Sequence, residues 1–138
     1  LTDTEMAAAA VRPMASRSLG ASVRTVLEWA PSIAPVGSTR TAAGMDAAWH
    51  QLEADRPAPI VLIGSAPTAL EVLLKLVAEG AALPTLVIGM PVGFVGVAES
   101  KRHLAESGLT QIRLDGTRGG AGLAGAALNS LLRAAQKA

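Results

Sequence analysis

The chain has 138 residues, half of them hydrophobic, and a formal net charge of +1, a size that suits a single domain with a sizeable core. Its basic residues are scattered, and two tryptophans and one phenylalanine are its only aromatic side chains, which leaves no footprint for nucleic acid. The lack of cysteine excludes disulfides and thiolate catalysis, and no apolar run is long enough to span a membrane.

Short apolar segments alternate with longer segments rich in alanine and leucine. The pattern predicts strands over residues 22–29, 60–63, 86–88 and 111–114. It predicts helices over residues 39–53, 67–79, 97–107 and 120–135, with a further short helix over residues 4–11. Strands and helices that alternate through short connections form right-handed crossovers. The sequence therefore predicts one α/β domain over residues 1–138, with a doubly wound, mainly parallel sheet and helices on both faces.

Four glycine-rich turns lead into predicted helices, at residues 37–40, 64–68, 89–96 and 116–120. Because open parallel sheets bind ligands beyond the carboxyl ends of their strands, we expect these turns to share one edge. Glycine lets the backbone approach a ligand closely, and helix N-termini offer unpaired N–H groups to anions. The edge would suit a ligand with several carboxylates or phosphates. The alternative interpretation is ordinary turn chemistry, which is common in α/β proteins.

Other motifs argue against several kinds of site. The turns contain neither GxGxxG nor GxxxxGK[ST], so neither dinucleotide nor P-loop binding is indicated. Ser65 does not lie in a GxSxG nucleophile elbow. His50 and His103 lie far apart in predicted helices, and without cysteine they make a poor metal set, so we expect no metal site. Each is interpreted as a surface or packing histidine.

The turns carry a specific resemblance to a known family. Residues 64–70, GSAPTAL, resemble the GNAPTAL stretch of precorrin-8X methylmutases, and residues 89–101, GMPVGFVGVAESK, resemble that family's G-x-PVGFVGAAESK run. Residues 37–43 resemble its GNTRSAA turn, and residues 118–120 with the helix that follows resemble its RGGS…NALL end. Residues 3–6 resemble its D-x-EM segment. The resemblance covers essentially the whole chain.

This resemblance implies a Rossmann-like α/β fold and a cytoplasmic homodimer. The implied activity is an isomerisation in cobalamin (corrin) biosynthesis. A methyl group moves within the ring C region of precorrin-8X to give hydrogenobyrinate, or does so on the cobalt complex. No organic cofactor is implied, and neither nucleic acid nor membrane is an expected partner. The tetrapyrrole substrate carries many acetate and propionate groups, which agrees with an anion-binding edge.

We expect eight residues to form this substrate-binding edge. They are Thr39, Arg40, Ser65, Thr68, Gly93, Gly96, Lys101 and Arg118. The two arginines would pair with substrate carboxylates, the hydroxyl side chains would offer hydrogen bonds, and the glycines would let the backbone meet the flat ring. For Lys101, a solvated charge on its helix is the alternative interpretation.

The chain also departs from the family pattern. The family's proposed proton donor is a histidine in an N-terminal stretch like MIHACG, which is absent here, and neither His50 nor His103 matches it. No catalytic residue is therefore assigned. Ser38 and Ser65 stand where the family usually has asparagine, and Ala121 stands where it often has serine.

Three hypotheses remain open at this stage. Because the chain begins without methionine, we expect it to start inside a longer polypeptide, which would be a complete methylmutase. The second hypothesis is a shortened paralogue that binds a corrinoid and catalyses nothing. The third is a different small-molecule enzyme on the same scaffold, since a fold does not fix a function.

Overall fold

Three short parallel strands form the centre of the computed structural model, which describes residues 1–137. They are β1 (Ile60–Ile63), β2 (Leu86–Gly89) and β3 (Gln111–Arg113), in the spatial order β1-β2-β3. In register, Ile60 lies opposite Leu86, and Val87 lies opposite Gln111. The strands predicted over residues 60–63, 86–88 and 111–114 are confirmed. Strands β1 and β2 are apolar throughout because helices cover both of their faces.

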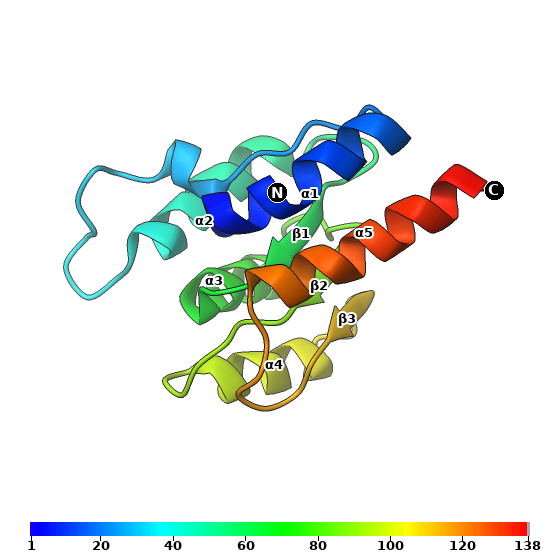
Figure 1. Cartoon of the computed structure of the whole chain (residues 1–138). Helices are drawn as coiled ribbons and strands as arrows, with labels where there is room; N and C mark the ends of the chain where they lie inside the picture. Colours follow the sequence, from blue (N-terminus) through cyan, green and yellow to red (C-terminus); the bar gives the residue numbers. More distant parts are fainter. Residues whose placement is uncertain (138) are drawn as a thin grey trace.

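The helices lie in two layers around this sheet (Figure 1). They are α1 (Glu5–Ser18), α2 (Arg40–Leu52), α3 (Pro67–Ala78), α4 (Val97–Glu106) and α5 (Ala121–Lys137). One apolar core joins α1 and α5 to one face of the sheet, and a second core joins α2, α3 and α4 to the other face. The predicted α/β architecture, with a parallel sheet and helices on both faces, is confirmed.

The predicted helices are confirmed, and one of them is longer than expected. The short helix predicted over residues 4–11 is α1, which begins with a cap at Thr4 and continues past Pro13 to Ser18. The Thr4 hydroxyl accepts a hydrogen bond from the backbone N–H of Ala7 at 3.2 Å. None of the helices that the structure describes is long and apolar enough to cross a lipid bilayer.

The strand predicted over residues 22–29 is wrong. Residues Val26–Trp29 form the 3₁₀ helix η1, and Thr25 makes an isolated bridge to Thr2. The Thr25 hydroxyl accepts from the N–H of Leu27 at 3.2 Å, and the Glu28 carboxylate accepts from the N–H of Thr25 at 3.0 Å. This reciprocal capping box stabilises a helical turn where the alternating pattern indicated an extended chain.

Residues 1–3 extend the sheet beyond β1. On one side their backbone pairs with Leu62 through two hydrogen bonds of 2.9 and 3.1 Å. On the other side Thr2 forms a parallel bridge with Thr25. Both bridges are parallel, so the sheet continues in the order Thr25, Thr2, β1, β2, β3. The pairing brings Asp3 to the carboxyl end of β1, which is the edge where the ligand loops were expected.

Small residues let α5 approach the carboxyl end of β1 closely. Gly64 follows β1 directly, and a Cβ atom built on it would lie 2.7 Å from the Cα of Ala121 at the start of α5. No well-packed structure accommodates such a contact without moving backbone. The close approach of these two elements therefore depends on glycine at position 64.

Replacing Gly64 with alanine tests this packing. We expect Gly64→Ala to lower the free energy of unfolding by about 1–3 kcal/mol, because the added methyl group meets backbone rather than a flexible side chain. Urea unfolding followed by circular dichroism measures the change. The matched control is Gly122→Ala, where a Cβ atom would meet open space and helix propensity favours alanine by about 1 kcal/mol. Equal stability of the two variants would contradict the packing argument.

Candidate functional site

The four glycine-rich turns lie along one edge of the sheet, toward the left in Figure 1. Thr39 and Thr68 join the first two turns through their hydroxyl oxygens, which lie 2.7 Å apart. The last two turns are joined by the backbone, where the N–H of Gly93 donates to the carbonyl of Thr117 at 3.0 Å. The structure thus brings together the segments that the sequence pattern assigned to one edge.

A groove of about 380 Å³ opens between the N-terminal ends of α2, α3 and α4. Three of the predicted residues line it: Thr39, Thr68 and Gly96. The carboxylates of Glu71 and Glu99 line it as well. Two acidic side chains make the groove itself unsuited to carboxylates of a ligand. It suits hydrogen-bonding or neutral parts of a ligand, while anionic groups need the cations outside it.

The turn after β1 is held from inside the protein by Asp3. This carboxylate has no exposed surface and accepts hydrogen bonds from three successive backbone N–H groups, those of Gly64 (3.1 Å), Ser65 (2.8 Å) and Ala66 (2.7 Å). These N–H groups precede α3, where an anion is favoured. The protein supplies that anion itself, so the start of α3 does not offer these donors to a ligand.

Two opposing effects act on the pKa of the Asp3 carboxyl. Burial raises its pKa, and the backbone N–H groups of Ala66, Gly64 and Ser65 act in the opposite direction by stabilising the ionised form. Sequence reasoning noticed Asp3 only as part of a family-like segment. The contact was missed because it joins residues more than sixty positions apart.

Two of the predicted edge residues are exposed arginines. Arg40 begins α2, and its Nε atom donates to the carbonyl oxygen of Pro31 at 2.8 Å. This contact holds the Nε atom of the guanidinium group against the loop before α2. Arg118 lies on the exposed loop before α5. Both residues were predicted from the sequence, and both reach solvent at the edge, where they can meet carboxylates.

Ser65 and Thr68 lie on the exposed surface at the start of α3, as predicted. Their environments differ, because Thr68 already contacts Thr39 whereas Ser65 is held through its backbone by Asp3. The Thr39 hydroxyl also caps α2 by accepting from the N–H of Ala42 at 3.0 Å. The hydroxyl groups of Thr39 and Thr68 therefore form a pre-ordered pair at the groove.

Lys101 was predicted to lie at the substrate-binding edge, with a solvated helix charge as the alternative, but in the structure it is buried. The side chain is completely buried, and its Nζ atom donates to the carbonyl oxygens of Gly116 at 2.8 Å and Arg118 at 2.6 Å. The interpretation as a solvated helix charge is therefore wrong. Burial lowers the pKa of Lys101, and the nearby Asp115 carboxylate opposes this effect.

The loop before α4 carries large apolar side chains into solvent. Phe94 and Val95 are each 89 % exposed, between Gly93 and Gly96, whose φ values are +131° and +74°. Positive φ angles are easily adopted by glycine. The two predicted glycines thus shape a loop that presents apolar side chains, which sequence reasoning overlooked by treating the PVGFVG run only as a turn.

A second loop presents apolar side chains at the same edge. Ile33 is 81 % exposed, and Val36 is fully exposed in the segment that leads to Thr39. In Figure 1 this segment and the loop before α4 project from the same side of the molecule. Isolated exposed apolar residues are common, whereas here two loops expose apolar side chains at one edge.

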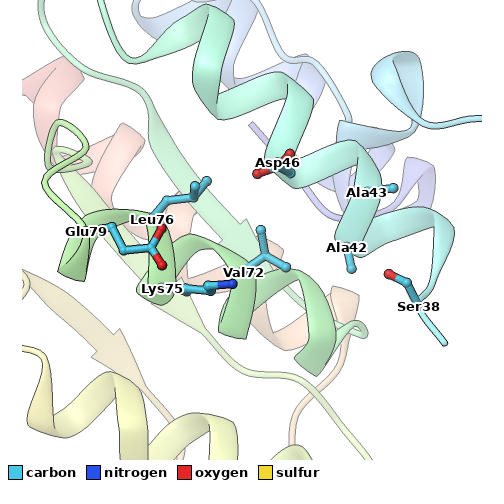
Figure 2. Close-up of a pocket in the computed structure, with 8 residues that line it drawn as sticks. All are labelled: Ser38, Ala42, Ala43, Asp46, Val72, Lys75, Leu76 and Glu79. Carbon is cyan, nitrogen blue, oxygen red and sulfur yellow. The ribbon is translucent and has the colours of Figure 1, made fainter. Parts of the chain in front are cut away.

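A further groove, of about 290 Å³, runs between α2 and α3 next to the edge (Figure 2). Asp46 lies on its α2 side, and Lys75 and Glu79 lie on its α3 side. The charges have mixed signs and do not converge on one point in Figure 2. This groove has no arrangement that resembles a catalytic site.

The two histidines lie on helix surfaces. His50 Nδ1 lies 2.7 Å from the carbonyl oxygen of Asp46, and His103 Nδ1 lies 2.6 Å from the carboxylate of Glu71. Both contacts are those of surface histidines, in agreement with their interpretation from the sequence. Within residues 1–137, no three histidine, aspartate or glutamate side chains come together as a metal site would require.

Taken together, these observations describe an α/β protein with apolar loops, hydroxyl groups and two arginines along one edge of its parallel sheet. The sequence model of one family, described as precorrin-8X methylmutase, matches residues 1–134. The chain belongs to this family. The family resemblance expected from the glycine-rich turns is thereby confirmed.

Individual relatives agree with this assignment. A cobalt-precorrin-8 methylmutase from Synechocystis is 39 % identical over 132 residues, which are 96 % of this chain and 58 % of that protein. A precorrin-8X methylmutase from Sinorhizobium is 46 % identical over 102 residues, which are 72 % of this chain and 47 % of that protein. The chain thus spans about half the length of these relatives.

A solved structure carries the same fold. The crystal structure of a precorrin-8X methylmutase from Thermus thermophilus superimposes with a TM-score of 0.83 and 37 % sequence identity. The match covers 99 % of this chain and 65 % of the Thermus chain. The whole of this chain therefore corresponds to a part of a methylmutase fold.

Asp3 provides a test of the loop anchor. We expect Asp3→Ala to lower the free energy of unfolding by about 2–4 kcal/mol, because three buried N–H groups lose their acceptor. Urea unfolding measures the loss. The matched control is Asp46→Ala, whose side chain is 57 % exposed and should change stability by less than about 0.5 kcal/mol. A loss at Asp3 no larger than that at Asp46 would rule out the anchor.

Proposed function

We propose that the polypeptide containing this chain is an isomerase of cobalamin biosynthesis. It would move a methyl group within the ring C region of precorrin-8X, or of its cobalt complex, and bind this tetrapyrrole at the edge described above. The family assignment supports the reaction. The observation that carries the binding proposal is the combination, at one edge, of exposed apolar loops with Arg40 and Arg118.

The proposed substrate has two kinds of surface that this edge complements. The flat face of the macrocycle is apolar and would lie against Phe94 and Val95, which are otherwise exposed to water. The acetate and propionate groups around the ring are anionic and would pair with Arg40 and Arg118. The hydroxyls of Thr39 and Thr68, which line the groove, would hydrogen-bond neutral polar atoms of the ring.

The proposed chemistry asks little of the protein beyond positioning and proton transfer. The methyl group leaves one ring carbon and bonds to its neighbour, so the molecular formula is unchanged and no net oxidation occurs. Holding the ring in one orientation lowers the barrier, and a positioned acid can favour the rearranged product. Neither His50 nor His103 lines the edge groove, so the proposal assigns the proton donor to neither.

The homodimer and the cytoplasmic location remain predictions from the family resemblance. The exposed Ile33 and Val36 support a dimer, because a second copy would remove these apolar side chains from water. Light scattering at several protein concentrations measures the molar mass directly.

Titration with hydrogenobyrinate, followed by its absorbance, tests the binding proposal. We expect Arg40→Gln and Arg118→Gln each to raise the dissociation constant on the order of tenfold, because each removes a charge-assisted hydrogen bond. Arg133→Gln, which removes an exposed arginine from the far end of α5, is the matched control and should bind as the unsubstituted protein does. Equal affinities of all three variants would contradict the assignment of the edge.

The apolar loop is tested separately. We expect Phe94→Ala to weaken hydrogenobyrinate binding on the order of tenfold, because the ring face loses about 100 Å² or more of apolar contact. Its thermal stability should be unchanged, since Phe94 is 89 % exposed in the free protein. Met6→Ala, at a residue 73 % exposed on α1, is the control. Undiminished binding by Phe94→Ala would remove this loop from the site.

A further inference from the structure

Lys101 is a completely buried cation whose ammonium group contacts a single loop. Its Nζ atom donates to the carbonyl oxygens of Gly116 and Arg118, at 2.8 and 2.6 Å. A buried charge is costly unless its hydrogen-bonding capacity is used. The nearby acid, Asp115, has its carboxylate 2.8 Å from the Nε atom of Arg113. The contacts of the ammonium group are thus directed to the backbone of the loop before α5.

The same loop is held on its other side by the loop before α4. The N–H of Gly93 donates to the carbonyl of Thr117 at 3.0 Å, and the N–H of Gly120 donates to the carbonyl of Met90 at 2.8 Å. Gly119 packs so closely on Met90 that a Cβ atom would lie 2.1 Å from the Met90 carbonyl oxygen. The loop before α5 is therefore held on one side by the loop before α4 and on the other side by the ammonium group of Lys101.

We propose that Lys101 is a positioning residue: its ammonium group holds the carbonyls of Gly116 and Arg118 and thereby fixes the loop that presents Arg118 at the ligand edge. Lys101 then acts on a bound anion through Arg118 and without touching the ligand. The part of this inference that concerns a ligand rests on the proposed function. The part that concerns the loop does not.

A purely structural lysine would give different results. If Lys101 only filled space in the core, a residue of similar length and volume would replace it with little change in the loop contacts. If it positions the loop, the effect should be confined to the loop contacts and to ligand groups bound by Arg118. Methionine has a similar volume and lacks the charge and the donors, so Lys101→Met separates the two roles.

The first experiment uses the ligand-free protein. We expect Lys101→Met to accelerate hydrogen exchange of the Gly93 and Gly120 amides on the order of tenfold, because the loop that they contact is released. The Ile88 amide in β2 should keep its rate. Lys75→Met, which removes a cation from the surface of α3, is the matched control. Unchanged rates at Gly93 and Gly120, or an equal rise at Ile88, would overturn the proposal.

The second experiment places Lys101 and Arg118 in a double-mutant cycle with hydrogenobyrinate as the probe. Lys101→Met and Arg118→Gln should each weaken binding on the order of tenfold, and the double variant should be no weaker than Arg118→Gln alone. Full affinity in Lys101→Met, or multiplied losses in the double variant, would overturn the proposal. If the unsubstituted protein binds no corrinoid, the proposed function fails and the exchange rates alone decide the role of Lys101.

A third measurement needs no substitution and applies if Lys101→Met does not fold. In the unsubstituted protein, the Nζ resonance of Lys101 should be protected from solvent exchange. It should also show coupling across hydrogen bonds to the carbonyl carbons of Gly116 and Arg118. A rapidly exchanging Nζ group without these couplings would overturn the proposal.

Discussion

The hydrogen bonds between the Asp3 carboxylate and the backbone of residues 64–66 are the contact on which the edge of this protein depends. Residues 1–3 pair with β1 as an additional strand, and that pairing carries Asp3 to the end of the sheet. There its carboxylate accepts hydrogen bonds from the backbone N–H groups that precede α3. The turn that carries Ser65 and leads to Thr68 is therefore fixed before any ligand arrives.

At the opposite end of the edge a buried charge also satisfies backbone groups of a loop, but this charge is positive. Lys101 is buried beneath the loop before α5 and holds its carbonyl groups. Each buried charge satisfies backbone groups of a loop at this edge, so Lys101, one of the three cations expected to meet substrate, is used inside the protein. Arg40 and Arg118 remain exposed at the edge, where they are proposed to meet carboxylates. Preorganised loops lower the ordering cost of binding, which suits the proposed rearrangement because it needs one fixed ring orientation.

Sequence reasoning succeeded where the signal was local. Continuous apolar runs in β1 and β2 indicated burial on both faces of the sheet. The glycine-rich turns indicated the family and predicted that these turns share one edge. The strand expected over residues 22–29 failed because a capping box between Thr25 and Glu28 outweighs the alternating pattern. The roles of Asp3 and Lys101 could not be predicted, because charged residues give no sign of burial and their partners are distant in the chain.

The most direct test of the account is to map hydrogenobyrinate binding on the assigned backbone amide spectrum of the chain. We expect chemical-shift changes concentrated in residues 31–40, 64–68, 90–96 and 116–120, around Arg40, Phe94 and Arg118. Changes concentrated instead in the apolar groove at the other end of the sheet, around Leu19, Pro59 and Leu132, would contradict it and place the ligand away from the loops that the buried charges hold.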